Sequence, residues 1–310
     1  MSKERIQKAL ARQGLGSRRQ IENWISEGLI SLNGKVITLG QQVESGDVVM
    51  YSGRKIIIRD DLQTLPRVLA YHKPEGEVCS RSDEKGRTTI FEHLPGLKHS
   101  RWIAVGRLDI NTSGLILLTD NGDLANKLMH PSSEVQREYA VRVMGAATKE
   151  QLKKLTHGVE LEDGPAKFDE IVETTFDDPT SNKSSLNRWY HVVLMEGRNR
   201  EVRRMWEAVD LKVSRLMRVR YGSVFLNKSQ RPGKVRELEP QEIRELGEIA
   251  GIEYSKDLRS GVPTGKNYRM TKHKPATRGA RRGTGSGDGG RTRQSTSTSG
   301  RRKVNHEKRR

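Results

Sequence analysis

The sequence predicts an α+β protein with a mixed, largely antiparallel sheet, preceded by a small domain and followed by a disordered basic tail. Three observations lead to this prediction. Strand patterns outnumber helix patterns between residues 67 and 255. Residues 1–60 show two short amphipathic helices followed at once by a hairpin signal. Residues 256–310 consist largely of Lys, Arg, Gly, Ser and Thr. Residues 61–66 are the expected linker.

The N-terminal domain is expected to begin with a helix whose apolar side holds Ile6 and Leu10. Residues 14–19 break and restart the helix, with Ser17 as the N-cap of the second one. The pair Asn33-Gly34 then marks a tight hairpin turn. This arrangement resembles the alpha-L RNA-binding motif. A DNA-binding helix-turn-helix is the rival, but a hairpin so soon after the second helix argues against it.

The alpha-L resemblance implies that this domain binds RNA through basic side chains. A charged helix face that merely contacts solvent is the alternative. The residues that we expect at the RNA-binding surface are Lys8, Arg12, Ser17, Arg18, Arg19 and Lys35.

The central domain is expected to be built mainly of strands. Alternating or apolar runs place them at residues 67–72, 102–105, 115–119, 138–143, 166–172, 189–195 and 213–221. The last of these strands should have a basic side formed by Arg215, Arg218 and Arg220. Helices are expected from a cap at Asp123 to His130, from a capping box at Thr148 to His157, and over residues 199–209 and 241–246. Residues 80–88 and 177–187 should be loops, the former a candidate for substrate contact.

The stretch around Asp109 is the strongest candidate for chemistry. Asp109 lies in a loop, residues 106–114, directly before the apolar strand 115–119. Catalytic groups are often placed on loops that rigid elements hold on both sides. On pattern alone, however, a simple turn aspartate is the more frequent meaning of such a residue.

Composition excludes several classes of site. Cys79 is the only cysteine, so the chain can form no intrachain disulfide and no cysteine-based metal site. The eight histidines lack zinc-ligand spacing. We therefore expect no metal site. No apolar run is long enough to cross a membrane and no apolar leader opens the chain, so we expect a cytoplasmic protein that contacts no membrane. We also expect a monomer that binds no DNA.

The net charge of +18 is concentrated at the C-terminus. Residues 256–310 hold 17 Lys and Arg against three acidic residues, which accounts for +14. Residues 276–300 contain no large apolar side chain, so this tail is expected to be disordered on its own. Clustered cations point to a polyanionic partner; a merely solubilising tail is the alternative.

Several motifs occur together and in order. They are Tyr71-His72-Lys73-Pro74-Glu75-Gly76, then residues 106–115 (GRLDINTSGL), then Arg137-Glu138-Tyr139-Ala140-Val141, then residues 196–206 (EGRNREVRRMW). The chain in this respect resembles the RNA pseudouridine synthases of the RsuA-like branch, over about residues 3–250. The resemblance implies a cofactor-independent isomerisation of uridine to pseudouridine on a mixed sheet with flanking helices.

The resemblance also implies roles for individual residues. Asp109 is expected to be the catalytic carboxylate, Tyr139 to stack on the uracil or serve proton transfer, and Arg203 to keep the carboxylate ionised. Arg200 or Arg204 could instead be that partner, and an addition to uridine and an abstraction of a ribose proton remain alternative mechanisms. The residues expected to bind substrate are Arg107, Leu216, Arg198, Arg200 and Arg204.

The basic tail and the closeness of the motif match favour large-subunit (23S) ribosomal RNA, or its assembly precursor, as substrate. Three alternatives remain. The first is a sister synthase acting on small-subunit ribosomal RNA or tRNA, and the second is an RNA-binding protein without catalysis. The third, a Ser/His/Asp hydrolase, lacks a Gly-x-Ser-x-Gly element.

Overall fold

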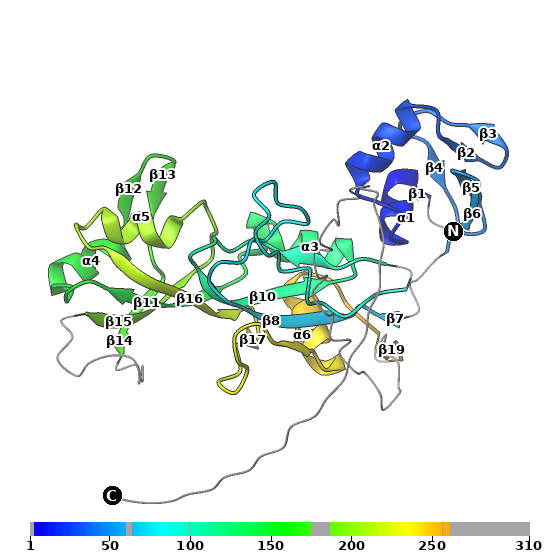
Figure 1. The fold of residues 1–310 in the computed structure, drawn as a ribbon. Helices are drawn as coiled ribbons and strands as arrows, with labels where there is room; N and C mark the ends of the chain where they lie inside the picture. Colours follow the sequence, from blue (N-terminus) through cyan, green and yellow to red (C-terminus); the bar gives the residue numbers. More distant parts are fainter. Residues whose placement is uncertain (1–2, 60–63, 99, 175–186, 256, 261–310) are drawn as a thin grey trace, which may run out of the picture. The chain divides into compact units, whose positions relative to one another are not determined.

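The computed structural model describes residues 3–59, 64–98, 100–174, 187–255 and 257–260 (Figure 1). The predicted basic tail therefore lies almost wholly outside the described residues, and so does most of the predicted 177–187 loop. No helix within the described ranges is long and apolar enough to cross a membrane.

The first part of the chain forms two helices and six short strands around a core of its own. They are β1 (Glu4–Arg5), α1 (Ile6–Arg12), α2 (Arg18–Ser26), β2 (Ile30–Leu32), β3 (Lys35–Val36), β4 (Gln42–Val43), β5 (Val48–Tyr51) and β6 (Arg54–Ile57). Ile6, Leu10 and Ile21 are fully buried in that core. The predicted N-cap is confirmed, because the Ser17 side chain accepts a hydrogen bond from the backbone N–H of Gln20 in a capping box.

The central sheet has nine strands and is mixed, as predicted (Figure 1). Its main path runs β14-β15-β11-β16-β10-β8-β18, with β17 paired to β16 and β9 paired to β10. The pair β10–β16 is parallel, and the other neighbouring strands are antiparallel. The strand bounds are β8 (Val68–Lys73), β9 (Ile103–Val105), β10 (Ser113–Thr119), β11 (Arg137–Val143), β14 (Glu170–Thr174), β15 (Arg188–Leu194), β16 (Val213–Tyr221), β17 (Val224–Phe225) and β18 (Val235–Glu237).

The remaining elements surround this sheet. The helices are α3 (Gly122–Met129), the short 3-10 helix η1 (Pro131–Ser133), α4 (Lys149–His157), α5 (Glu201–Glu207) and α6 (Pro240–Ile249). Two further two-stranded sheets consist of β12 (Val159–Leu161) with β13 (Gly164–Ala166), and of β7 (Thr64–Leu65) with β19 (Arg259–Ser260).

Apolar clusters cover both faces of the sheet. On β8, Leu69 and Tyr71 belong to one cluster, which includes Trp206 of α5, whereas Val68 and Ala70 belong to another, built with α3 and α6. Side chains alternate between the faces of a strand, so this division means that the centre of the sheet is buried on both sides. A centre of this kind is a rigid support for the loops at its edges.

Gly114 makes the parallel pairing of β10 with β16 possible. A Cβ atom at this position would lie 2.3 Å from the carbonyl oxygen and 2.6 Å from the backbone nitrogen of Arg218. Its φ of +105° is also one that residues with a side chain rarely adopt. Glycine here therefore lets β16 approach the end of the 106–112 loop.

Three local predictions were wrong. The N-cap of α3 is Asn121, whose side chain accepts hydrogen bonds from the N–H groups of Asp123 and Leu124, and Asp123 lies in the first turn. The predicted strand over residues 166–172 is two strands, because β13 ends at Ala166 and β14 starts at Glu170.

The third wrong prediction is the common basic side of β16. The register of β11 against β16 shifts between Glu138 and Tyr139, where Arg220 and Arg218 are their respective partners. Arg220 consequently binds Glu138 at 2.9 Å, whereas Arg218 is buried. Arg215 is exposed. Strict alternation already places Arg215 on the opposite face from Arg218 and Arg220, and the bulge gives Arg218 and Arg220 different surroundings.

Candidate active site

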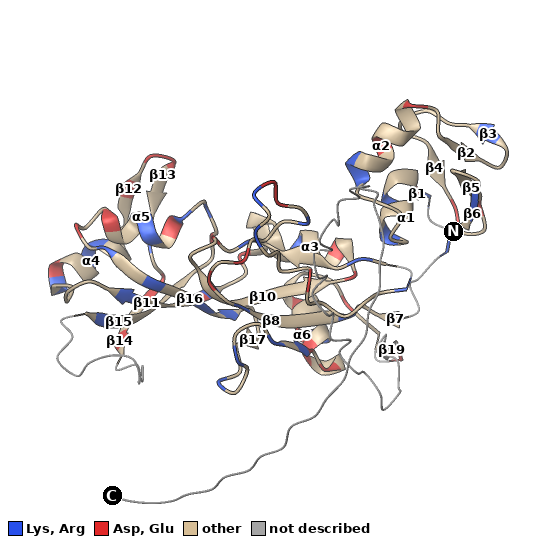
Figure 2. Cartoon of the chain, in the orientation of Figure 1, with Lys and Arg blue, Asp and Glu red and all other residues tan. Residues whose placement is uncertain are grey.

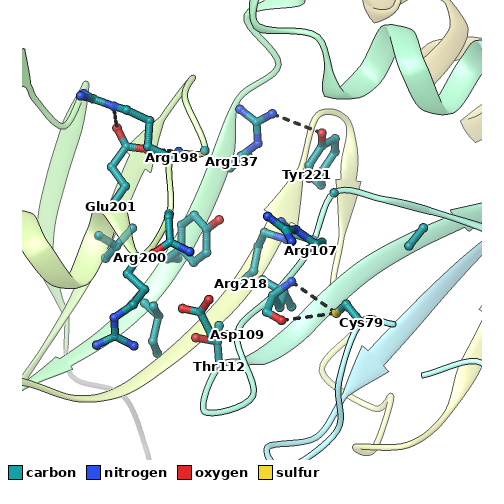
Figure 3. A pocket seen from close by; sticks show the side chains of 18 of the residues that line it. Cys79, Arg107, Asp109, Thr112, Arg137, Arg198, Arg200, Glu201, Arg218 and Tyr221 are labelled. Carbon is teal, nitrogen blue, oxygen red and sulfur yellow. Dashed lines mark hydrogen bonds and ion pairs between the residues drawn. The ribbon is translucent and has the colours of Figure 1, made fainter. Parts of the chain in front are cut away.

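A pocket of about 660 Å³ contains the motif aspartate. Its wall is formed by residues 78–80, the 106–112 loop, strands β11 and β16, and the turn that leads into α5. A volume of this size is ordinary for a small-molecule or nucleotide site. Figure 3 shows the side chains that line it, with Asp109 between Arg200 and Cys79 in this view.

The main chain on the C-terminal side of Asp109 is held by two buried cations. Lys73, at the end of β8, is fully buried, and its Nζ donates to the carbonyl oxygen of Thr112 at 2.8 Å. Arg203, from α5, is 5% exposed and donates to the carbonyl oxygen of Asn111 at 2.8 Å. Elements distant in the sequence therefore fix two consecutive carbonyl groups of the loop.

The other contacts of the loop come from the segment after β8. The N–H of Gly76 donates to the carbonyl oxygen of Ile110 at 2.7 Å. The Cys79 thiol donates to the carbonyl oxygen of Leu108, and its sulfur accepts from the N–H of Leu108, each at 3.4 Å. The motif Lys73-Pro74-Glu75-Gly76 thus supports the aspartate loop directly.

Asp109 itself is half-buried, and its carboxylate lies in the pocket. Among the described residues, no protein group donates a hydrogen bond to this carboxylate; the only backbone contact of Asp109 is from the N–H of Thr112 to its carbonyl oxygen, 3.1 Å. Protein hydrogen bonds therefore hold the main chain of the loop, whereas the Asp109 carboxylate has no partner among the described residues. Such a carboxylate is available to a ligand without first breaking protein contacts.

Two apolar surfaces accompany the carboxylate. Tyr139 on β11 is 8% exposed and lines the pocket, and it pairs with Arg218 on the neighbouring strand. Leu216 of β16 is 4% exposed and lines it too. An aromatic ring and a branched apolar side chain can bind the two sides of a flat base.

The pocket is rich in arginine. Arg107 is exposed, and Arg200 occupies the N-cap of α5 in a left-handed conformation with φ of 49°. Arg198 is engaged by protein: its Nε lies 3.1 Å from Glu201 and it also binds Glu196. Burial raises the pKa of Glu201, although the nearby Arg198 opposes that shift.

Two predicted site residues lie outside the pocket wall. Arg204 donates to both carboxylate oxygens of Asp163 at 2.8 Å, so its guanidinium is used to bind the β12–β13 hairpin. Arg203 forms no ion pair with Asp109 within the described ranges; instead it supports the loop through Asn111, and it also donates to the carbonyl oxygen of Val213, the first residue of β16, at 3.2 Å. Arg203 is therefore close to the aspartate without being its hydrogen-bond partner.

The sequence predictions gave no site role to four residues that shape the site, although Lys73 and Arg137 stand in two of the motifs that carry the family resemblance. Lys73 is buried beneath the loop, while Arg137, Arg218 and Tyr221 line the pocket. Burial lowers the pKa of Lys73, and nearby acidic groups oppose this shift. Arginines on a strand resemble solvent-exposed residues in a sequence, and no pattern there marks them as buried. Figure 2 shows the cations that β11 and β16 carry.

The residues predicted to bind RNA in the N-terminal domain have different roles. Arg18, Arg19 and Lys35 are exposed. Arg12 binds Glu4 within the domain, and Ser17 caps α2. Lys8 is partly buried. The first turn of α2 has two arginines and no acidic residue, although the helix dipole disfavours cations there. The two arginines therefore do not stabilise the start of α2, and their binding of RNA stays a prediction.

No group of three or more His, Cys, Asp or Glu side chains in the described ranges could hold a metal ion.

Comparison with known proteins places these features in a family context. The RNA pseudouridylate synthase family model matches residues 67–208, and the S4 domain model matches residues 4–49. The chain is 53% identical over 249 residues to ribosomal large subunit pseudouridine synthase B of Pseudomonas aeruginosa. That match covers 80% of this chain and 63% of the Pseudomonas protein, so the chain spans less than two thirds of that relative.

Other relatives match along most of their length. The proteins of the same name from Yersinia pestis and Escherichia coli K12 are each 48% identical, over 91% and 90% of this chain and 86% and 94% of their own lengths. A solved crystal structure of a pseudouridylate synthase superposes with a TM-score of 0.53 at 26% identity, covering 78% of this chain and 99% of that one.

Proposed function

The chain belongs to the RNA pseudouridylate synthase family, and we propose that it isomerises one uridine of large-subunit (23S) ribosomal RNA to pseudouridine. The observation that carries this proposal is the geometry at Asp109. Its carboxylate projects into a nucleotide-sized pocket and accepts no hydrogen bond from the described residues, while its loop is fixed by Lys73 and Arg203. The substrate class rests on the relatives, which are named for the large ribosomal subunit.

In the proposed reaction, the N1–C1′ bond of the uridine breaks, the uracil rotates, and a C5–C1′ bond forms. The proton on C5 is then lost and N1 regains a proton, so atoms balance without any added reagent. Asp109 is the catalytic carboxylate, which either adds covalently or takes a ribose proton. A carboxylate that the protein leaves unbonded suits both alternatives.

Tyr139 and Leu216 support this chemistry by holding the base. A base that is detached and rotated must stay near C1′, and the two side chains supply an apolar enclosure for it. The phenol of Tyr139 is the candidate to move the C5 proton, since it lines the same pocket as Asp109.

Access to the pocket requires the uridine to leave its stack. Arg107 is exposed and directly precedes the Leu108-Asp109 pair, so it is the candidate to occupy the gap left in the RNA. The S4 domain, with exposed Arg18 and Arg19, is the candidate for a further RNA contact. We propose that the protein acts in this way as a cytoplasmic monomer on ribosomal RNA or an assembling subunit.

The function is tested by pseudouridine mapping. Large-subunit rRNA, small-subunit rRNA and tRNA from cells that lack the gene are incubated separately with the purified protein. We expect one new pseudouridine, in the large-subunit RNA. A new pseudouridine only in tRNA or in small-subunit rRNA would contradict the substrate assignment, and none in any RNA or ribosomal particle would contradict the reaction.

The monomeric state is tested by light scattering of the full-length chain during gel filtration. A mass near 35.1 kDa is expected. A mass twice as large, stable on dilution to assay concentration, would contradict it.

A further inference from the structure

Arg218 is a buried cation with unused hydrogen-bonding capacity. It is 2% exposed and lines the pocket from β16. Its Nε donates to the carbonyl oxygen of Leu115 at 2.8 Å. Its Nη2 is buried and has no hydrogen-bond partner. A buried donor without a partner is costly, so an unused guanidinium nitrogen in a pocket wall points to a ligand.

A second buried arginine lies against the same aromatic ring. The guanidinium carbon of Arg218 lies 5.0 Å from the centre of the Tyr221 ring, and that of Arg137 lies 5.2 Å from it. Arg137 is 8% exposed and donates only to uncharged groups, among them the Tyr221 hydroxyl at 3.3 Å and the carbonyl oxygen of Glu196 at 3.0 Å. The Tyr221 hydroxyl itself donates to the carbonyl oxygen of Leu128 at 2.8 Å.

Neither of these cations has a carboxylate partner in the described ranges. Five arginines line the pocket but only two carboxylates do, Asp109 and Glu201. Arg198 already binds Glu201. Asp109 accepts no hydrogen bond from Arg218. Burying a cation without a counter-charge is strongly unfavourable, so this wall of the pocket is suited to an anion.

We propose that Arg218, Tyr221 and Arg137 form a phosphate site for the RNA strand that carries the target uridine. Arg218 donates through Nη2, the nitrogen that has no protein partner, to a non-bridging oxygen of the phosphodiester that flanks that nucleotide. Tyr221 and Arg137 are positioning residues that hold the guanidinium plane. The proposal rests on the proposed function, since it concerns the same pocket. A phosphate fits better than a uracil carbonyl because it supplies the missing negative charge and can accept from a guanidinium.

Because Arg218 lies on β16 beside Leu216, the phosphate site has a defined position relative to the base of the reacting nucleotide. Arg218 and Leu216 are two residues apart and both line the pocket, so a base held by Leu216 lies near a phosphate held by Arg218. Gly114 allows the close approach of β10 to the backbone of Arg218, which sets this relation. A bound phosphate would therefore fix the position of the ribose relative to Asp109.

The test combines protein variants with RNA in which single phosphates are neutral. The RNA is the segment that the wild-type protein modifies, made with a methylphosphonate at each linkage around the target uridine in turn. Dissociation constants are measured for the wild type, R218Q, and the matched control R215Q, an exposed arginine on the same strand. Turnover of the unmodified RNA by the wild type is followed in parallel.

We expect R218Q to bind the unmodified RNA about 10-fold to 100-fold more weakly than the wild type does. At one linkage beside the target uridine, the neutral RNA should be bound equally by R218Q and by the wild type. R215Q should show no such dependence on any single linkage. Two results would overturn the phosphate site. One is that R218Q binds more weakly than the wild type to the RNA whichever linkage is neutral, and the other is that R218Q binds the unmodified RNA as tightly as the wild type does.

If R218Q does not fold, R218K replaces it. The lysine ammonium keeps the positive charge but lacks the forked donor geometry of arginine. Neutralising the contacted phosphate should therefore weaken RNA binding by R218K, but by a smaller factor than it weakens binding by the wild type. An equal factor for the two proteins would contradict the proposed contact. The turnover measured in parallel separates the two hypotheses. If the wild type does not convert the unmodified RNA, the proposed function is contradicted. If it does convert that RNA but the effect of R218Q does not depend on any single phosphate, only this phosphate site is contradicted.

Discussion

At Asp109, contacts from four other residues hold the main chain of residues 108–112 while the carboxylate projects into the pocket. Lys73, Gly76, Cys79 and Arg203 supply these contacts, and all come from segments outside the loop. Catalysis that depends on placing one carboxylate against a ribose benefits from such preorganisation, since small displacements of a reacting group are expensive in rate.

Replacing Lys73 with methionine should separate loop support from folding. Burial lowers the pKa of Lys73, so its charged form weakens folding at neutral pH, and methionine removes that cost. Methionine also leaves the carbonyl groups of Pro74 and Thr112 without their donor, which offsets that gain. The free energy of unfolding should therefore change by no more than about 1–2 kcal/mol, while kcat falls about 100-fold because the Thr112 carbonyl loses its anchor. Urea unfolding and single-turnover kinetics measure the two effects, with the exposed Lys154→Met as control. Full activity in K73M would refute the anchoring role.

Asp120, which directly follows β10, should make stability depend on pH. Burial raises the pKa of Asp120 to about 6, although the N–H of Arg67 donates to it at 2.9 Å. The folded state therefore binds a proton more tightly than the unfolded state does. This group favours folding below pH 4, and that contribution is lost as the pH rises from about 4 to about 6.

Asp120→Asn should remove this dependence, since the amide oxygen can still accept from Arg67. Relative to the wild type, the variant should gain roughly 2–3 kcal/mol of unfolding free energy between pH 4 and pH 7. Urea midpoints at both pH values give this difference. If the unfolding free energies of the two proteins changed with pH in the same way, the raised pKa of Asp120 would be contradicted.

At the scale of elements, Gly114→Ala tests the close approach of β10 and β16. A Cβ would lie 2.3 Å from a backbone oxygen of Arg218, and backbone cannot move aside as a flexible side chain does. We expect a loss of about 3 kcal/mol or more in unfolding free energy. Gly96→Ala is the control, because a Cβ there meets no atom within 4 Å. Equal urea midpoints for the two variants would mean that the strands separate easily.

Most elements were predictable from local patterns, and the errors have local causes. The bounds of β16 and the capping boxes of α2 and α4 follow directly from side-chain alternation and from Ser/Thr spacing. Asn121 was overlooked because Asp123 is an equally good capping residue two positions later. The bulge in β11–β16 leaves no local signal, so the separation of Arg218 from Arg220 could not be foreseen.

The site was predicted in part, and only where a motif names a residue. Asp109, Tyr139, Arg107 and Leu216 do line one pocket, whereas their roles in catalysis stay predictions. Arg204 stands next to Arg203 in sequence, but its partner Asp163 lies on a separate hairpin that local patterns do not relate to it. Lys73 and Arg218 act through burial, which depends on the assembled sheet.

On the scale of the whole molecule, charge is distributed unevenly along the chain. Residues 256–310 hold 17 of the 57 basic residues and only three acidic ones. The domain boundaries at residues 60, 66 and 255 stay predictions. Within the expected linker, Thr64–Leu65 form β7, so part of that segment is ordered by pairing with β19.

Removing residues 256–310 should weaken RNA binding and flatten its salt dependence. For every phosphate that the shortened chain no longer neutralises, the slope of log K against log salt should become shallower by somewhat less than one. Turnover at saturating RNA should remain, because no residue of the pocket is removed. Filter binding at several salt concentrations measures the slope. An unchanged slope would show that the tail does not contact RNA.

The role of Asp109 is tested most directly by comparing Asp109→Asn with the wild type on the same RNA. Asparagine keeps the size of the side chain and removes its charge and nucleophilicity. We predict that the variant binds large-subunit rRNA with nearly the affinity of the wild type but leaves the target uridine unconverted in pseudouridine mapping. Conversion of that uridine by the variant at the wild-type rate would contradict the central role of Asp109.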